Sequence, residues 1–171
     1  MAALTTPDAK ADARGPSPAE RLRFLRALGA SSVPTWAAID RAPSDGASTL
    51  VVADRVRRAG FSEADLTDWI RDARHLMALE HPNVPRVRGV LIRADEVLVV
   101  TDFADGVRWS ELASTASLES SLRVLVDVLT GLNALHNLRD AKRAPLKLLH
   151  GALAPDQVLV GLDGVTRLLG S

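Results

Sequence analysis

The chain has 171 residues, and its 21 Lys and Arg balance its 21 Asp and Glu, so the formal net charge is zero. A balanced charge gives no field that would gather nucleic acid or an anionic membrane, and we expect neither as a partner. The absence of cysteine excludes disulfides and thiolate metal sites and suits a cytoplasmic protein. No apolar run is long enough for a signal-peptide core or a membrane span.

The first third of the chain predicts a tail followed by strands. Residues 1–19 are rich in Ala, Pro, Ser and Asp without apolar periodicity, which is typical of a flexible tail. Ser17 to Glu20 suit a helix start, whereas Leu22 to Gly29 equally suit a strand, and local signals leave both open. Two apolar stretches, at 36–38 and 49–56, are separated by a turn-rich segment and predict a strand hairpin.

The middle of the chain predicts one helix and a second hairpin. Ser62 is a good N-cap, and apolar residues recur at helical spacing up to Met77, before a His-Pro-Asn turn at 81–83. The β-branched runs 87–92 and 97–103 flank a charged four-residue turn, which favours an antiparallel pair.

The last third predicts a long helix and a closing hairpin. Leucines recur at steps of four and three from Leu118 to Leu132, so we expect an amphipathic helix that begins after Ser117 and ends near His136. Runs at 158–160 and 165–169 flank an Asp-Gly turn, which predicts a tight hairpin.

Three phrases occur in one order along the chain: LEHPNV at 79–84, VVTDFADG at 99–106 and HGALAPDQVLV at 150–160. They resemble the helix exit, hinge and catalytic loop of bacterial serine/threonine protein kinases. The resemblance implies a degenerate, C-terminally truncated pseudokinase of α+β class. Its kinase-like small lobe and hinge, with a twisted antiparallel sheet and one helix, would be residues 20–106. The first long helix and catalytic-loop hairpin of a large lobe would be residues 107–171.

The same resemblance implies that the positions for phosphoryl transfer are replaced. Ala152 stands where the family has the aspartate base, and losing a general base costs about 10²- to 10⁴-fold in rate. Gly170 and Gln157 stand at the two metal-ligand positions. Arg55 replaces the phosphate-contacting lysine, and Asp72 replaces its glutamate partner, so an Arg55–Asp72 ion pair and a solvated Asp72 are both open. No catalytic residue is therefore intact.

A nucleotide site, if present, would be weak. The resemblance implies ATP as the cofactor and gives no expectation of Mg²⁺ or another metal. Trp36 either fills the adenine site or packs within the sheet. The residues implied to contact the nucleotide are Gly29, Trp36, Ala53, Arg55, Thr101, Asp102, Ala104 and Leu159.

These observations favour a non-catalytic binding or scaffolding module. The leucine stripe of helix 118–136 predicts a protein partner or self-association, because an uncovered apolar stripe invites contact. Two alternatives stay open: a residual ATP-dependent serine/threonine kinase or related phosphotransferase, and a truncated remnant without function.

Overall fold

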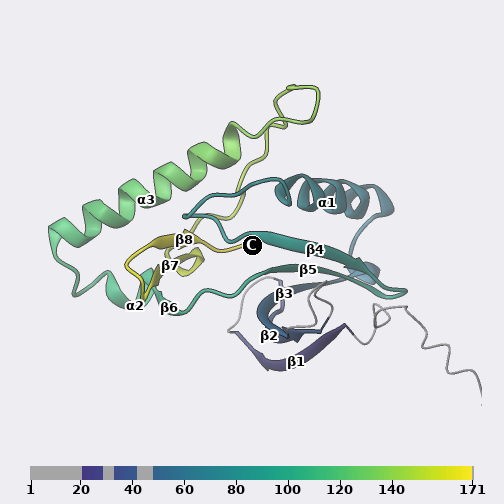
Figure 1. The fold of residues 1–171 in the computed structure, drawn as a ribbon, viewed down its shortest axis with the longest axis horizontal. Helices are drawn as coiled ribbons and strands as arrows, with labels where there is room; N and C mark the ends of the chain where they lie inside the picture. The colour runs from purple at the N-terminus through teal and green to yellow at the C-terminus, as the bar shows by residue number, and fades with distance from the viewer. Residues whose placement is uncertain (1–20, 29–32, 42–47, 171) are drawn as a thin grey trace, which may run out of the picture.

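A computed structural model describes residues 21–28, 33–41 and 48–170, and the observations below refer to these residues. The predicted tail 1–19 and the predicted nucleotide contact Gly29 lie outside them. Figure 1 shows a larger sheet crossed by one helix, and a smaller sheet with a long helix beside it.

The larger sheet has five antiparallel strands in the order β1-β2-β3-β5-β4. Their bounds are β1 Leu22–Ala27, β2 Thr35–Asp40, β3 Thr49–Arg57, β4 Val87–Ile92 and β5 Glu96–Asp102. The strand alternative for Leu22 to Gly29 is thus the one observed. Both predicted hairpins are confirmed, because β2 pairs with β3 and β4 pairs with β5.

Each face of this sheet carries its own apolar cluster. One face carries a cluster of seven buried residues. Ala38, Val51 and Leu98 of this cluster are completely inaccessible to solvent. The opposite face carries Val56 and Val97, which pack against α1, Glu63–Leu76. The predicted helix start is confirmed, since the Ser62 hydroxyl accepts a hydrogen bond from the Asp65 backbone N–H at 3.1 Å.

The second part of the molecule begins at Gly106. Strands β6 Gly106–Arg108, β7 Val158–Gly161 and β8 Thr166–Leu168 form a three-stranded antiparallel sheet. The short helix α2, Trp109–Leu112, leads to α3, Leu118–His136. Ser117 caps α3 as predicted, and the predicted β7–β8 hairpin is confirmed, with Gly164 at a φ of +78° in its turn.

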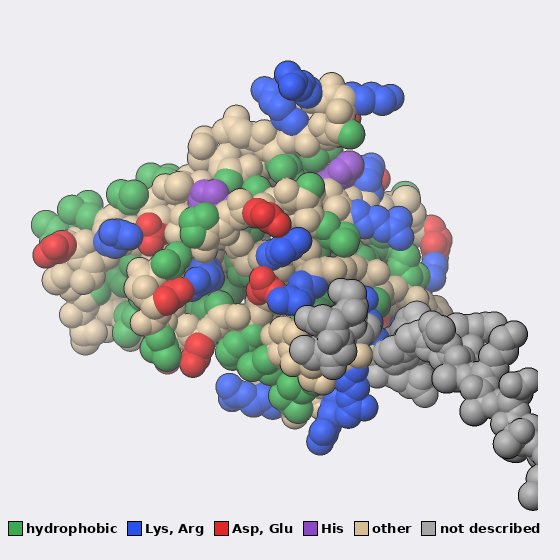
Figure 2. All heavy atoms as spheres, viewed as in Figure 1, with side chains coloured by type: hydrophobic (Ala, Val, Ile, Leu, Met, Phe, Trp, Pro, Cys, Tyr) green, Lys and Arg blue, Asp and Glu red, His purple; other side chains and the backbone are tan. Residues whose placement is uncertain are grey.

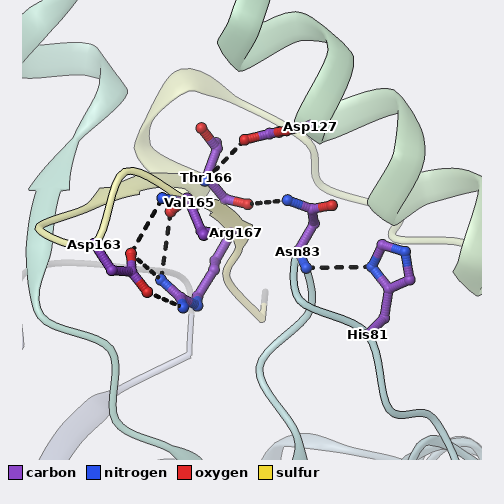
Figure 3. A network of polar contacts seen from close by, with 7 residues as sticks. All are labelled: His81, Asn83, Asp127, Asp163, Val165, Thr166 and Arg167. Carbon is purple, nitrogen blue, oxygen red and sulfur yellow. Dashed lines mark hydrogen bonds and ion pairs between the residues drawn. The ribbon is translucent and has the colours of Figure 1, made fainter.

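A buried amide ties the two parts together. Asn83 lies in the turn between α1 and β4, is 5% exposed, and donates from Nδ2 to the Thr166 carbonyl at 2.8 Å. Its own carbonyl accepts from the Leu168 N–H at 2.8 Å. The Thr166 N–H in turn donates to Asp127 of α3 at 3.1 Å, so three segments meet at one network (Figure 3).

The helix α3 approaches this turn closely at one point. A Cβ at Gly131 would lie 3.0 Å from Leu168 Cδ1 and 3.2 Å from both the Asn83 Cβ and its carbonyl oxygen. The buried face of α3 also contributes Val124, Val128 and Leu135 to the second apolar core. A residue without a side chain at 131 therefore permits the contact between helix and turn.

The predicted fold class is corrected by this architecture. The expectation was an α+β, kinase-like small lobe continued by the first helix and hairpin of a large lobe. The structure is a small domain organised mainly by strands, with a five-stranded antiparallel sheet, a three-stranded sheet and few helices. The physical reason is that most of the fully buried apolar residues belong to the larger sheet. Helix α1 packs on one face of the larger sheet, whereas α3 packs against β8 of the smaller one.

Candidate functional site

A large cavity lies between the α1 face of the larger sheet and the C-terminal segment. Its volume is about 980 Å³. Apolar side chains from both parts of the molecule form most of its wall: Val52, Trp69, Ala73, Leu76, Val99, Leu159 and Leu168. A cavity of this size and character is typical of a small-molecule site.

The register of β3 decides which of its side chains reach this cavity. Val52 and Asp54 line the cavity, and they pair with Thr101 and Val99 of β5, which also line it. Ala53, which lies between them, belongs to the apolar cluster of the opposite face. Because strand side chains alternate between faces, Arg55 shares that opposite face with Ala53.

Asp54 is the buried charged group of the cavity wall. It is 9% exposed, and its Oδ1 accepts a hydrogen bond from the Thr35 hydroxyl at 2.8 Å. Burial raises the pKa of the Asp54 carboxyl above its ordinary value, and the Thr35 hydrogen bond partly opposes that rise. An aspartate inside a β-branched strand has low strand propensity, and this is the signal that could have pointed to Asp54. The resemblance pointed instead to its neighbours, Ala53 and Arg55.

Arg55 and Asp72 do not form an ion pair with each other, although the sequence left that pair open as an alternative to a solvated Asp72. The Arg55 guanidinium contacts Glu96 of β5, a carboxylate that is only 3% exposed and also accepts from Arg93 at 2.9 Å. Asp72 lies on the cavity wall and pairs with its neighbour Arg71 at 3.1 Å.

The remaining predicted site residues divide into two groups. The residues that line the cavity are Asp72, Thr101, Asp102, Ala104, Gln157, Leu159 and Gly170. Trp36, Ala53, Arg55 and Ala152 are not part of its wall. Trp36 packs edge-on against Phe24 with ring centroids 5.9 Å apart, so packing within the sheet is the observed alternative. Ala152 is exposed.

The rim of the cavity mixes both signs of charge. Arg108 donates to the Asp156 carbonyl, and to the Leu28 carbonyl at 3.2 Å, and so connects β6 to the end of β1 and the segment before β7. Asp102 is held by Arg88 of β4. The rim therefore carries no excess of positive or negative charge. The buried wall differs, because Asp54 places a single carboxylate there.

The imidazole of His150 is hydrogen-bonded to the backbone beside the cavity. Its Nε2 lies 2.7 Å from the Leu169 carbonyl, and a carbonyl only accepts, so Nε2 carries the proton. Its Nδ1 is buried and has no hydrogen-bond partner within the described part of the chain. The imidazole thus fixes the last residues of the chain beside the cavity.

A second candidate surface is the outer face of α3. Leu118 is 76% exposed, and Leu122, Leu125, Val126 and Leu129 are all more than half exposed. Figure 2 shows apolar side chains, in green, along the part of the molecule where α3 runs. The face opposite to them is buried in the second core.

Among residues 21–28, 33–41 and 48–170, no group of three or more His, Cys, Asp or Glu side chains is arranged to hold a metal ion. Within the same residues, no helix combines the length and apolarity needed to cross a membrane.

Comparison with known proteins gives distant relatives. No family model matches the chain. It is 28% identical to ephrin type-A receptor 8 of Rattus norvegicus over 116 residues, which are 67% of this chain and 30% of that protein. It is 28% identical over 124 residues, 72% of this chain, to ephrin type-B receptor 3 of Danio rerio and to ephrin type-A receptor 8 of Homo sapiens, covering 24% and 12% of them. The chain thus spans less than a third of these curated relatives.

These relatives correct the predicted family and function. The three sequence phrases predicted a bacterial serine/threonine pseudokinase, whereas the similarity runs to vertebrate proteins named as ephrin receptors. Nothing in that similarity supports a bacterial origin or the pseudokinase module, and neither is carried forward.

Proposed function

We propose that the chain is a protein-interaction domain that self-associates through the exposed apolar face of α3. The observation that supports this most directly is the row Leu118, Leu122, Leu125 and Leu129, each more than half exposed. A contiguous apolar patch on an otherwise charged surface is typical of a protein-binding site.

The spacing of this row favours another helix as its occupant. The four leucines follow one another at steps of four, three and four, which is the a/d seam of two packed helices. From Leu118 to Leu129 the seam extends about 16 Å at 1.5 Å per residue. A seam of this kind accepts side chains of a facing helix between its own.

A second copy of α3 fits this seam in charge as well as in shape. The charged residues beside the exposed row are one acid, Glu119, and one base, Arg123, so the face carries no net charge that would require an oppositely charged partner. Arg123 is already paired with Asp127 at 3.4 Å. A two-fold axis would place the same patch on both copies.

The relatives agree with a protein-binding role in a general way. They are named as receptors for ephrins, and this chain spans only a part of each, so the name does not transfer a ligand to it. The proposal therefore rests on α3.

The test is the molar mass in solution, measured by light scattering after size exclusion over a range of concentrations. We expect dimers that dissociate on dilution for the natural chain, and monomers for Leu125→Glu. The matched control is Leu162→Glu, which changes an equally apolar residue that is 76% exposed but lies in the β7–β8 turn. A natural chain that stays monomeric at high concentration would contradict the proposal.

A second candidate function is small-molecule binding in the cavity, and ATP stays the predicted cofactor. The supporting observation is that Thr101, Asp102 and Ala104 line a cavity of about 980 Å³. Arg55, the residue implied to contact phosphates, contacts Glu96 instead. A thermal-shift titration with ATP, with and without Mg²⁺, tests this binding, because a ligand that binds the folded state raises the melting temperature.

A further inference from the structure

We propose that the cavity between the larger sheet and the C-terminal segment binds a ligand with an apolar body and a protonated amine, and that Asp54 is its counter-ion. This inference concerns a different surface from α3 and does not depend on self-association. Three observations carry it: the chemistry of the walls, the state of the carboxylate, and the space beside it.

The walls select an apolar body. Val52 and Val99 come from the sheet, Leu76 comes from α1, and Leu159 and Leu168 come from β7 and β8. Burying the apolar surface of a ligand against such side chains contributes about 25 cal/mol per Å². These five side chains themselves offer no charge to a ligand that packs against them.

The carboxylate selects a cation. A buried charge is costly unless it is paired, and among the described residues Asp54 has the Thr35 hydroxyl as a partner but no cation. Two of the cations that line the cavity are engaged elsewhere, since Arg71 pairs with Asp68 and Asp72 and Arg108 donates to backbone carbonyls. Arg26 and Lys147 also line it, and neither is hydrogen-bonded to Asp54, whose side-chain partner is Thr35. An ammonium group would supply the missing charge and a charge-assisted hydrogen bond.

One carboxylate oxygen is available for that bond. Thr35 occupies Oδ1, whereas Oδ2 has no hydrogen-bond partner among the described residues. Gly170 lies beside it, and a Cβ at that position would come within 3.0 Å of Oδ2. The absence of a side chain at Gly170 therefore leaves room next to the free oxygen.

An anionic ligand fits this geometry poorly. A phosphate placed beside Asp54 would meet its carboxylate, and like charges at close range repel. A metal ion is also disfavoured, because the described residues bring no three metal-ligating side chains together.

The experiment compares two probes that differ in charge but hardly in shape. Isothermal titration of the natural chain with tryptamine and with tryptophol, in which a hydroxyl replaces the amine, isolates the contribution of the cation. We expect tryptamine to bind about tenfold or more tightly than tryptophol. Equal affinities, absence of tryptamine binding, or tighter binding of ATP than of tryptamine would overturn the inference.

A matched pair of variants locates the effect. Asp54→Asn keeps the size of the side chain and an acceptor for Thr35, so it should bind tryptamine no better than tryptophol. Asp95→Asn removes an exposed acid from the β4–β5 turn, outside the cavity wall, and should keep the tenfold preference. If both variants lose the preference, or neither does, Asp54 is not the counter-ion. The comparison on the natural chain stays decisive even if Asp54→Asn does not fold.

Discussion

Asp54 and Arg55 are neighbours on β3, and their side chains lie on opposite faces of the sheet. Asp54 lines the cavity and has no cation partner among the described residues, whereas Arg55 contacts the buried Glu96 on the other side. The alternation of a strand thus puts the acid, and not the base, into the cavity. A ligand that reaches the β3 wall of this cavity therefore meets a carboxylate.

Replacement of Asp54 by Asn should change the pH dependence of stability. Burial raises the pKa of Asp54 above its unfolded value, so the folded state holds the proton more tightly and stability falls as pH rises through that interval. We expect Asp54→Asn to be at least as stable as the natural chain at pH 7, with a smaller difference at pH 3. Urea unfolding at the two pH values measures this, and a variant less stable only at pH 7 would contradict it.

Removal of the Asn83 side chain should loosen the joint between the two sheets. Asn83→Ala leaves the buried Thr166 carbonyl without its 2.8 Å donor, and an unsatisfied buried group costs about 1–3 kcal/mol. Chemical denaturation gives the change in unfolding free energy. The control is Asn133→Ala on the exposed side of α3, expected to change stability by less than about 0.5 kcal/mol. Similar losses for both variants would count against the joint.

A large side chain at Gly131 should force α3 away from the turn. The Cβ alone would come within 3.0 Å of Leu168, and overpacking of this kind costs about 1–3 kcal/mol. We expect Gly131→Leu to lower the melting temperature although it removes a glycine from a helix. Asn133→Leu adds the same side chain two residues further on, where it is exposed, and should be tolerated.

The exposed Asp163 should titrate at unusually low pH. Hydrogen bonds from Arg167 and from the Val165 N–H lower the pKa of Asp163 to about 2. Since the folded pKa is lowered, the contribution of this pair is present at neutral pH and is lost as pH falls toward 2. Carboxyl-carbon NMR would show the low midpoint, and Arg167→Gln should move it upward. An unchanged midpoint in the variant would mean that the pair does not form in solution.

Much of the element order could be predicted because local patterns determined it. The Ser62 and Ser117 caps, the leucine spacing of α3 and the Asp-Gly turn at 163–164 each specify structure within a few residues, and all are observed. Strand β6 was missed, because its three residues are held by pairing with β7, more than 50 positions away. A contact of that separation leaves no local pattern.

The candidate site was harder to predict for the same reason. A shift of one residue exchanges the two faces of a strand, so Ala53 and Arg55 were assigned to the cavity that Val52 and Asp54 line. Thr101, Ala104 and Leu159 do lie on its wall. Whether they contact ATP stays a prediction, as does a cytoplasmic location.

The buried amide of Asn83 also has a consequence for unfolding. Its two backbone partners, Thr166 and Leu168, belong to the last strand, while Asn83 itself belongs to the turn that leads into the first sheet. If β8 separated from the rest of the molecule, the hydrogen bonds between Asn83 and the backbone of Thr166 and Leu168 would break. Amide hydrogen exchange at Leu168 should therefore require global opening, and the two sheets should melt in one cooperative transition.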